Sequence, residues 1–180
     1  MNINLRLLTI EDTNEYWEVG FKNPDKDMFY YTGTTHYPTK EEIKTFVEKS
    51  TSDDERRHFL IWGKENNILG EVVLMDIDDE YRSCGFRIAI FNKENFNKGI
   101  GYKATKEALK VAFNEMNLHR VELEVFDYNS RAKAMYEKAG FTEEGIKRDA
   151  LYINNEFHNV YIMSILKNEF MEGNNWNLKH

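Results

Sequence analysis

The sequence has a single cysteine and no apolar run approaching the ~20 residues that cross a bilayer. Cys84 therefore has no partner for an internal disulfide, which indicates a reducing compartment and predicts a cytoplasmic protein. The N-terminus lacks a signal-peptide pattern, and we expect no membrane partner. Cys84 is interpreted as a small packed hydrophobe, with a catalytic thiol as the alternative.

Basic residues are scarce relative to acidic ones. The 180 residues include 24 Lys and Arg against 31 Asp and Glu, a formal net charge of −7. Phosphate backbones select basic surfaces, so we expect no nucleic-acid partner. The acidic balance is compatible with cationic substrates such as amines. Hydrophobic residues at 41% favour a globular core over disorder, and the length fits one domain.

Two familiar ligand-binding patterns are also missing. Neither the GxGxxG nor the GxxxxGK[S/T] nucleotide motif occurs. The histidines lack metal-ligand spacing, and we therefore predict no metal. They are His36, His58, His119, His158 and His180.

A glycine loop stands between a strand-like run, 85–91, and a helix-like run that ends near Met116. Its sequence is Asn95-Phe96-Asn97-Lys98-Gly99-Ile100-Gly101-Tyr102. Glycines let a backbone approach a ligand closely, and the first amides of a helix lack internal partners and carry positive charge. The loop is therefore predicted to bind phosphate, although an ordinary tight turn would have the same pattern.

Periodicity and capping residues locate the other elements. Strands are expected at 2–8, 58–62, 68–75, 81–91 and 119–126, followed by a hairpin at 151–153 and 157–166. Further helices are expected from about Thr9 to Val19, after Thr39, and from Asn129 to Ala139. A strand, a helix and a second strand in succession suggest a parallel pair with a crossover.

Three segments keep two interpretations each. The aromatic residues of 23–38 either pack a loop on the core or form a substrate-pocket wall. The acidic residues of 76–80 form either a solvated connection or a cation or amine site. In 119–126, Glu122 and Glu124 share the face opposite Val121, Leu123 and Val125, and are either solvent-facing or functional.

The stretch LEVFDYNSRAKAMYEKAGF (123–141), with the loop FNKGIG upstream, resembles the GNAT family of N-acetyltransferases. The segment GIKRDALYINNEFHNVYIMSIL is similar to the ribosomal-protein alanine N-acetyltransferase (RimJ/RimL) branch, which also includes bacterial spermidine N-acetyltransferases. The resemblance extends from Asn2 to about Phe170. It implies an α/β (α+β) single-domain fold at 1–167, with 168–180 as a loose C-terminal tail.

The resemblance further implies a mixed, mostly antiparallel sheet of about seven strands flanked by about four helices. The sheet would open between its fourth and fifth strands, with acetyl-CoA as co-substrate in the gap. Ile88, Ala89 and Ile90 would contact the pantetheine arm, and the stretch from Phe96 to Tyr102 would hold the pyrophosphate. Asn129 would also contact the cofactor. The family usually has Gln or Arg where this chain has Phe96, and Gly where it has Asn97.

Acetyl transfer to an amine requires a neutral amine, a stabilised oxyanion and a protonated leaving thiolate. By the resemblance, Tyr136 is the general acid and a backbone amide near Ile88 holds the oxyanion; a merely packed tyrosine is the alternative. Because a free alkyl amine is largely protonated at pH 7, a base is useful. Glu124 is our first candidate, Glu122 the second and Glu71 a weaker third.

The acceptor is the least determined feature. A protein N-terminal amine fits the RimJ/RimL likeness best, and a polyamine or another small amine is the alternative. The polyamine enzymes carry an acidic residue in the third strand, where this chain has Val73. A non-catalytic acetyl-CoA-binding module and a purely structural protein are rivals of other classes. The family commonly dimerises, so a homodimer or higher homo-oligomer is an expectation.

Overall fold

The computed structural model describes residues 2–176 of the chain. Its centre is one seven-stranded sheet in the order β1-β2-β3-β4-β5-β7-β6. The strands are β1 (Ile3–Leu7), β2 (Arg57–Gly63), β3 (Ile68–Asp78), β4 (Ser83–Ile90), β5 (Arg120–Phe126), β6 (Thr142–Ile153) and β7 (Glu156–Leu166). Neighbours are antiparallel except β4 and β5, which are parallel. The predicted mixed, mostly antiparallel sheet is confirmed.

Six α-helices flank this sheet in the described part of the chain, against about four predicted. They are α1 (Thr13–Gly20), α2 (Lys26–Tyr31), α3 (Lys40–Thr51), α4 (Ile100–Lys110), α5 (Ser130–Ala139) and α6 (Lys167–Trp176). A π-helical stretch, Val111–Glu115, continues α4. The expected capping box of Thr39 with Glu42 begins α3, and Gly140, at φ 107°, ends α5. These two helix boundaries confirm the sequence signals.

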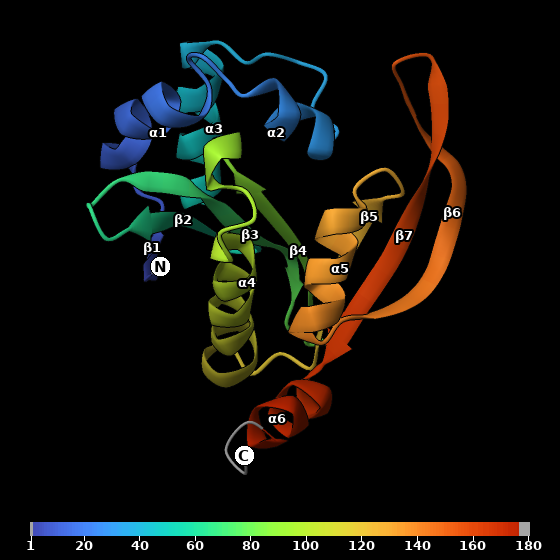
Figure 1. Ribbon diagram of the computed structural model, residues 1–180. Helices are drawn as coiled ribbons and strands as arrows, with labels where there is room; N and C mark the ends of the chain where they lie inside the picture. Colours follow the sequence, from blue (N-terminus) through green and yellow to red (C-terminus); the bar gives the residue numbers. More distant parts are fainter. Residues whose placement is uncertain (1, 177–180) are drawn as a thin grey trace.

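The helices lie on both faces of the sheet. Figure 1 shows α4 and α5 side by side, α1, α2 and α3 grouped at the top of the view, and the β6–β7 hairpin at the right, extending past the end of α5. Alternation along β2 separates two cores: Phe59 and Ile61 pack with residues of α4 and α5, whereas Leu60 and Trp62 pack with residues of α1, α2 and α3. Cys84 is buried in the first core. Burial and the nearby Glu122 raise the pKa of its thiol to about 12, which suits a packed rather than a reactive cysteine.

The expectation of a loose tail from residue 168 is wrong for residues 168–176, which belong to α6. Phe170 is 1% exposed, and its ring centroid lies 5.3 Å from that of Phe113. Burial of this one aromatic side chain fixes the helix to the first core. Residues 177–180 of the predicted tail lie outside the described residues.

Candidate functional site

The parallel strands β4 and β5 separate after a short paired segment. Ser83, Cys84 and Gly85 pair with Arg120, Val121 and Glu122, and the remaining residues of the two strands do not pair with each other. A cavity of about 900 Å³ occupies the opening between them. The predicted gap between the fourth and fifth strands is therefore confirmed.

The glycine loop opens directly onto this cavity. Gly99 is the N-cap of α4 with φ 74°, and no side chain caps the helix. Asn97 also has a positive φ, 60°, a conformation that Asn tolerates better than most residues. The first amides of α4 are thus available to an anion, and the helix dipole favours one there.

Nearly all the residues predicted to bind the cofactor line this one cavity. They are Ile88, Ala89, Ile90, Phe96, Asn97, Gly99, Ile100, Gly101, Tyr102 and Asn129. Lys98 is exposed and is not among the lining residues. Asn129 caps α5 through a hydrogen bond from the amide of Ala132 (3.2 Å), and its side-chain amide donates to the carbonyl of Tyr31 (3.4 Å). Contact of these residues with acetyl-CoA stays a prediction.

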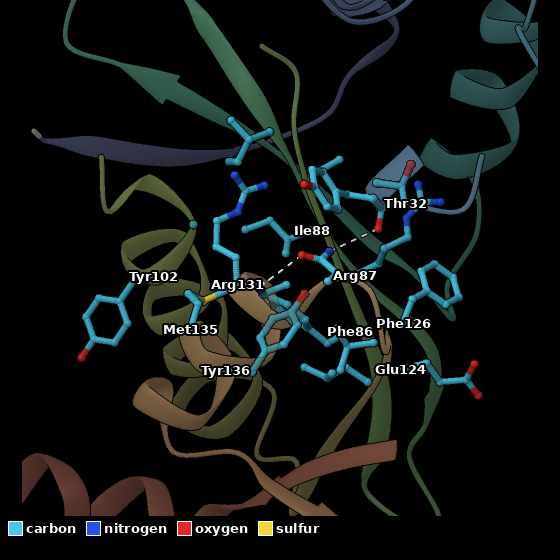
Figure 2. A pocket seen from close by; sticks show the side chains of 18 of the residues that line it. Thr32, Phe86, Arg87, Ile88, Tyr102, Glu124, Phe126, Arg131, Met135 and Tyr136 are labelled. Atoms are coloured by element: carbon cyan, nitrogen blue, oxygen red, sulfur yellow. Dashed lines mark hydrogen bonds between the residues drawn. The ribbon is translucent and has the colours of Figure 1, made fainter. Parts of the chain in front are cut away.

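Tyr136 lines the same cavity from α5. Its side chain is buried, and its ring makes edge-on contacts with Phe86 (6.1 Å between centroids) and Phe141 (5.7 Å). In Figure 2 its ring lies beside Phe86 and Met135 on one wall. Burial raises the pKa of the phenol well above its ordinary value. The hydroxyl therefore stays protonated at neutral pH, as a proton donor must.

The candidate bases lie on the opposite face of β5 from the buried Val121, Leu123 and Val125. Glu124 forms an ion pair with Lys147 of β6, and this hydrogen bond raises the pKa of the lysine. In Figure 2 the carboxylate of Glu124 points away from Tyr136. Glu122 lines the cavity too and accepts hydrogen bonds from Arg120 (3.0 and 3.3 Å). Both carboxylates are about half exposed, so water can reach them.

Glu71, the third candidate base, is buried and already fully engaged. One carboxylate oxygen accepts hydrogen bonds from Tyr16 Oη (2.5 Å) and pairs with His58 Nε2 (3.0 Å), and the other accepts from Arg87 (2.9 Å). Burial alone would raise the pKa of Glu71, but Arg87, His58 and Tyr16 together lower it to about 2. A carboxylate that holds its proton so weakly is a poor base at neutral pH. Its position indicates a structural role.

Glu71 borders a second cavity of about 270 Å³ beside the first. This second cavity is lined by aromatic residues of α1, α2 and α3, and it shares Met28, Thr32, Arg87 and Ala89 with the first. Val73, where an acidic residue was expected for a polyamine enzyme, is fully buried two residues beyond Glu71 in β3. The third strand does carry a carboxylate, at a different position.

Sequence reasoning missed several lining residues. Arg87, Arg131, Ala132 and Met135 lie close to predicted residues in the chain and also line the cavity. Met28, Tyr31 and Thr32 come from α2 and the residue after it, which the sequence left as a loop with a pocket wall as one interpretation. The Asp25 side chain caps this helix, and that capping residue was the available signal.

Residues 2–176 contain neither a metal-binding cluster nor a membrane-spanning helix. No three His, Cys, Asp or Glu side chains gather there in an arrangement that could hold a metal ion. No helix in this range is long and apolar enough to cross a membrane.

Comparison with known proteins gives consistent matches. The family model described as acetyltransferase (GNAT) domain matches residues 2–142. A spermidine N(1)-acetyltransferase of Vibrio cholerae is 30% identical over 149 residues, covering 83% of this chain and 86% of the relative. A putative ribosomal N-acetyltransferase of Bacillus subtilis is 30% identical over 180 residues, covering 94% and 93%. The crystal structure of spermidine N-acetyltransferase from Vibrio cholerae in complex with CoA and spermine superimposes with a TM-score of 0.84 at 28% identity, covering 94% of this chain and 98% of that one.

Proposed function

The chain belongs to the GNAT acetyltransferase family, and we propose that it acetylates a polyamine of the spermidine and spermine class. In reaction type, the chain is an acetyl-CoA-dependent N-acetyltransferase. The observation that carries the proposal is the similarity, over nearly the whole of both chains, to a spermidine N-acetyltransferase with CoA and spermine bound. The sequence motifs put a protein N-terminal amine first, but the comparisons favour the polyamine alternative.

The charge of the open sheet face supports a cationic acceptor. Asp76, Glu122 and Glu124 all line the large cavity. Glu122 and Glu124 are about half exposed, so an ammonium group can approach their carboxylates from solvent. The net charge of −7 acts in the same direction at longer range.

In the proposed reaction, the acceptor amine attacks the thioester carbonyl of acetyl-CoA directly in a ternary complex. Glu124 takes the proton of the ammonium, through water where needed, and the neutral nitrogen forms the new amide bond. A backbone amide near Ile88 stabilises the oxyanion. The carbon–sulfur bond then breaks, and Tyr136 gives its proton to the leaving thiolate. The second proton that the nitrogen loses as the amide forms passes through water and restores the phenol of Tyr136.

The test is release of CoA thiol from acetyl-CoA with a panel of acceptors: spermidine, spermine, putrescine, and peptides that begin with Ala, Ser or Met. The proposal expects kcat/KM for spermidine or spermine to exceed that for every peptide by at least about tenfold, about 1.4 kcal/mol of transition-state discrimination. Preferential turnover of a peptide would favour the second candidate, a protein N-terminal acetyltransferase, which the ribosomal relative supports. Binding of acetyl-CoA without turnover of any acceptor would favour a non-catalytic module.

The cytoplasmic location and a homo-oligomeric state belong to the same proposal. The first is supported by the single cysteine, and the second by family likeness alone.

A further inference from the structure

The side chain of Arg131 is held between two aromatic rings at the edge of the large cavity. Its guanidinium carbon lies 4.1 Å from the ring centroid of Phe96 and 4.8 Å from that of Tyr31. The centroids of the two rings are 6.3 Å apart, and their planes are inclined at 66°. Cation–π attraction favours this placement and restricts the guanidinium to one orientation. In Figure 2, Arg131 and Tyr136 both extend from α5, in different directions.

Arg131 has no anionic partner in the part of the chain that the structure describes. Among residues 2–176, no carboxylate lies within ion-pair distance of it. It is the second residue of α5, where the positive end of the helix dipole makes a cation unfavourable. An unpaired cation in this position is explained if an anion joins it when the site is filled.

The surroundings of Arg131 are suited to an anion. It lines the cavity together with Asn97, Gly99 and Gly101 of the glycine loop. Neither α4 nor α5 has an acidic residue in its first turn, whereas α1, α2, α3 and α6 each have at least one. The two helices that open onto the cavity therefore keep their N-terminal positive charge uncompensated.

We propose that Arg131 binds the pyrophosphate of acetyl-CoA and that Phe96 and Tyr31 orient it for this contact. The loop position that usually carries Gln or Arg holds Phe96 here, and the structure brings a guanidinium onto that phenyl ring from α5. The polar side chain that this loop position lacks is thus supplied from another helix. A guanidinium can give two parallel hydrogen bonds to phosphate oxygens, so it can replace the missing polar side chain.

The experiment measures the Kd of acetyl-CoA by calorimetry without an acceptor, so its result does not depend on which amine is the substrate. Arg131→Ala should weaken binding by about 10- to 100-fold, as expected for loss of a charged hydrogen-bonded contact. Lys133→Ala is the matched control: it also removes a cation from α5, but Lys133 pairs with Glu137 and Glu143. The Kd of acetyl-CoA for Lys133→Ala should stay within about twofold of the wild-type value.

Truncated cofactors locate the contact. Acetyl-dephospho-CoA keeps the pyrophosphate and lacks the 3′-phosphate, and S-acetyl-pantetheine lacks both. Arg131→Ala should weaken binding of acetyl-dephospho-CoA by the same factor as that of acetyl-CoA, and leave S-acetyl-pantetheine unaffected. A loss confined to acetyl-CoA would assign Arg131 to the 3′-phosphate and overturn the proposal. An equal loss with S-acetyl-pantetheine would mean that the substitution distorts the pocket, and would overturn it as well.

The role of Phe96 is tested by a double-mutant cycle. Phe96→Leu keeps an apolar side chain but removes the π-face, and it should weaken acetyl-CoA binding in the Arg131 background far more than in the Arg131→Ala background. Additive effects of the two substitutions would show that Phe96 does not orient the guanidinium. Arg131→Lys should recover part of the lost affinity, because an ammonium keeps the charge without the planar fork.

Discussion

Arg87, whose side chain is about half exposed, donates a hydrogen bond of 2.9 Å to the carboxylate of Glu71, which is buried. The second oxygen of Glu71 is held by Tyr16 and His58, and Ser50 contacts His58 Nδ1 at 3.2 Å. One buried carboxylate thus connects α1, α3, β2, β3 and β4. Arg87 lines both cavities, and its hydrogen bond to Glu71 fixes the orientation of its side chain there.

Replacing Glu71 with Gln should lower stability at neutral pH. The substitution leaves Arg87 without its charge partner and weakens the hydrogen bonds with the buried Tyr16 and His58. Because solvent screens the half-exposed Arg87, the expected cost is about 1 to 2 kcal/mol of unfolding free energy. The measurement is urea unfolding at pH 7. Glu124→Gln, which removes a half-exposed carboxylate, is the control and should stay within about 0.5 kcal/mol.

The same carboxylate predicts how stability depends on pH. In the folded protein the pKa of Glu71 is lowered to about 2 from an ordinary 4.5. A lowered folded-state pKa contributes stability that is fully present above about pH 5 and is lost as the pH falls through about 2. The stability difference between the wild type and Glu71→Gln should therefore shrink across this window. A difference that stays constant from pH 7 to pH 3 would contradict the ion-pair assignment.

Replacing Tyr136 with Phe should lower kcat by about 10²- to 10⁴-fold, the range expected for loss of a general acid, with little change in the Kd of acetyl-CoA. Burial raises the pKa of the phenol well above its ordinary value. The wild-type rate should therefore not decline through phenol ionisation up to about pH 10. Steady-state kinetics over this range tests both points. An unchanged kcat in Tyr136→Phe would assign Tyr136 to packing against Phe86 instead.

Replacing Glu124 with Gln tests the base. At pH 7 kcat should fall by about 10²-fold or more, and part of the loss should be recovered toward pH 10, where the amine loses its proton without help. Glu122→Gln is the matched variant on the same face of β5. If Glu122→Gln loses activity and Glu124→Gln does not, the assignment passes to Glu122.

Local sequence patterns predicted those parts of the site that lie within one strand or at the start of one helix. The alternation of 120–126 oriented Glu122 and Glu124 correctly, and the pair Gly99 and Gly101 located the start of α4. The six residues of α2 were missed because such a short helix has no repeating apolar face for periodicity to detect. The sequence shows the aromatic side chains of this segment but does not indicate the helix that carries them.

The tertiary contacts of the site had no local signal. Glu71 lies 55 residues from Tyr16, 13 from His58 and 16 from Arg87, so this cluster forms only when four elements pack together. The stacking of Arg131 on Phe96 likewise joins α5 to the segment before α4. Such contacts depend on the sheet register and on helix packing, which periodicity does not specify.

The α6 helix, for which the sequence predicted only a tail, is held to the domain by Phe170. Phe170 is 1% exposed, packs against Phe113, and carries Lys106 over its ring, with Nζ 4.4 Å from the centroid. Phe170→Ala should therefore lower the unfolding free energy by about 3 to 5 kcal/mol, the usual cost of removing a buried aromatic ring. Phe157→Ala is the matched control because Phe157 is 65% exposed, and it should change stability by less than about 0.5 kcal/mol. Urea unfolding of the two variants measures both losses of unfolding free energy. Equal, small losses would mean that α6 contributes nothing to the stability of the domain, whereas the expected difference makes it part of the core beneath α4.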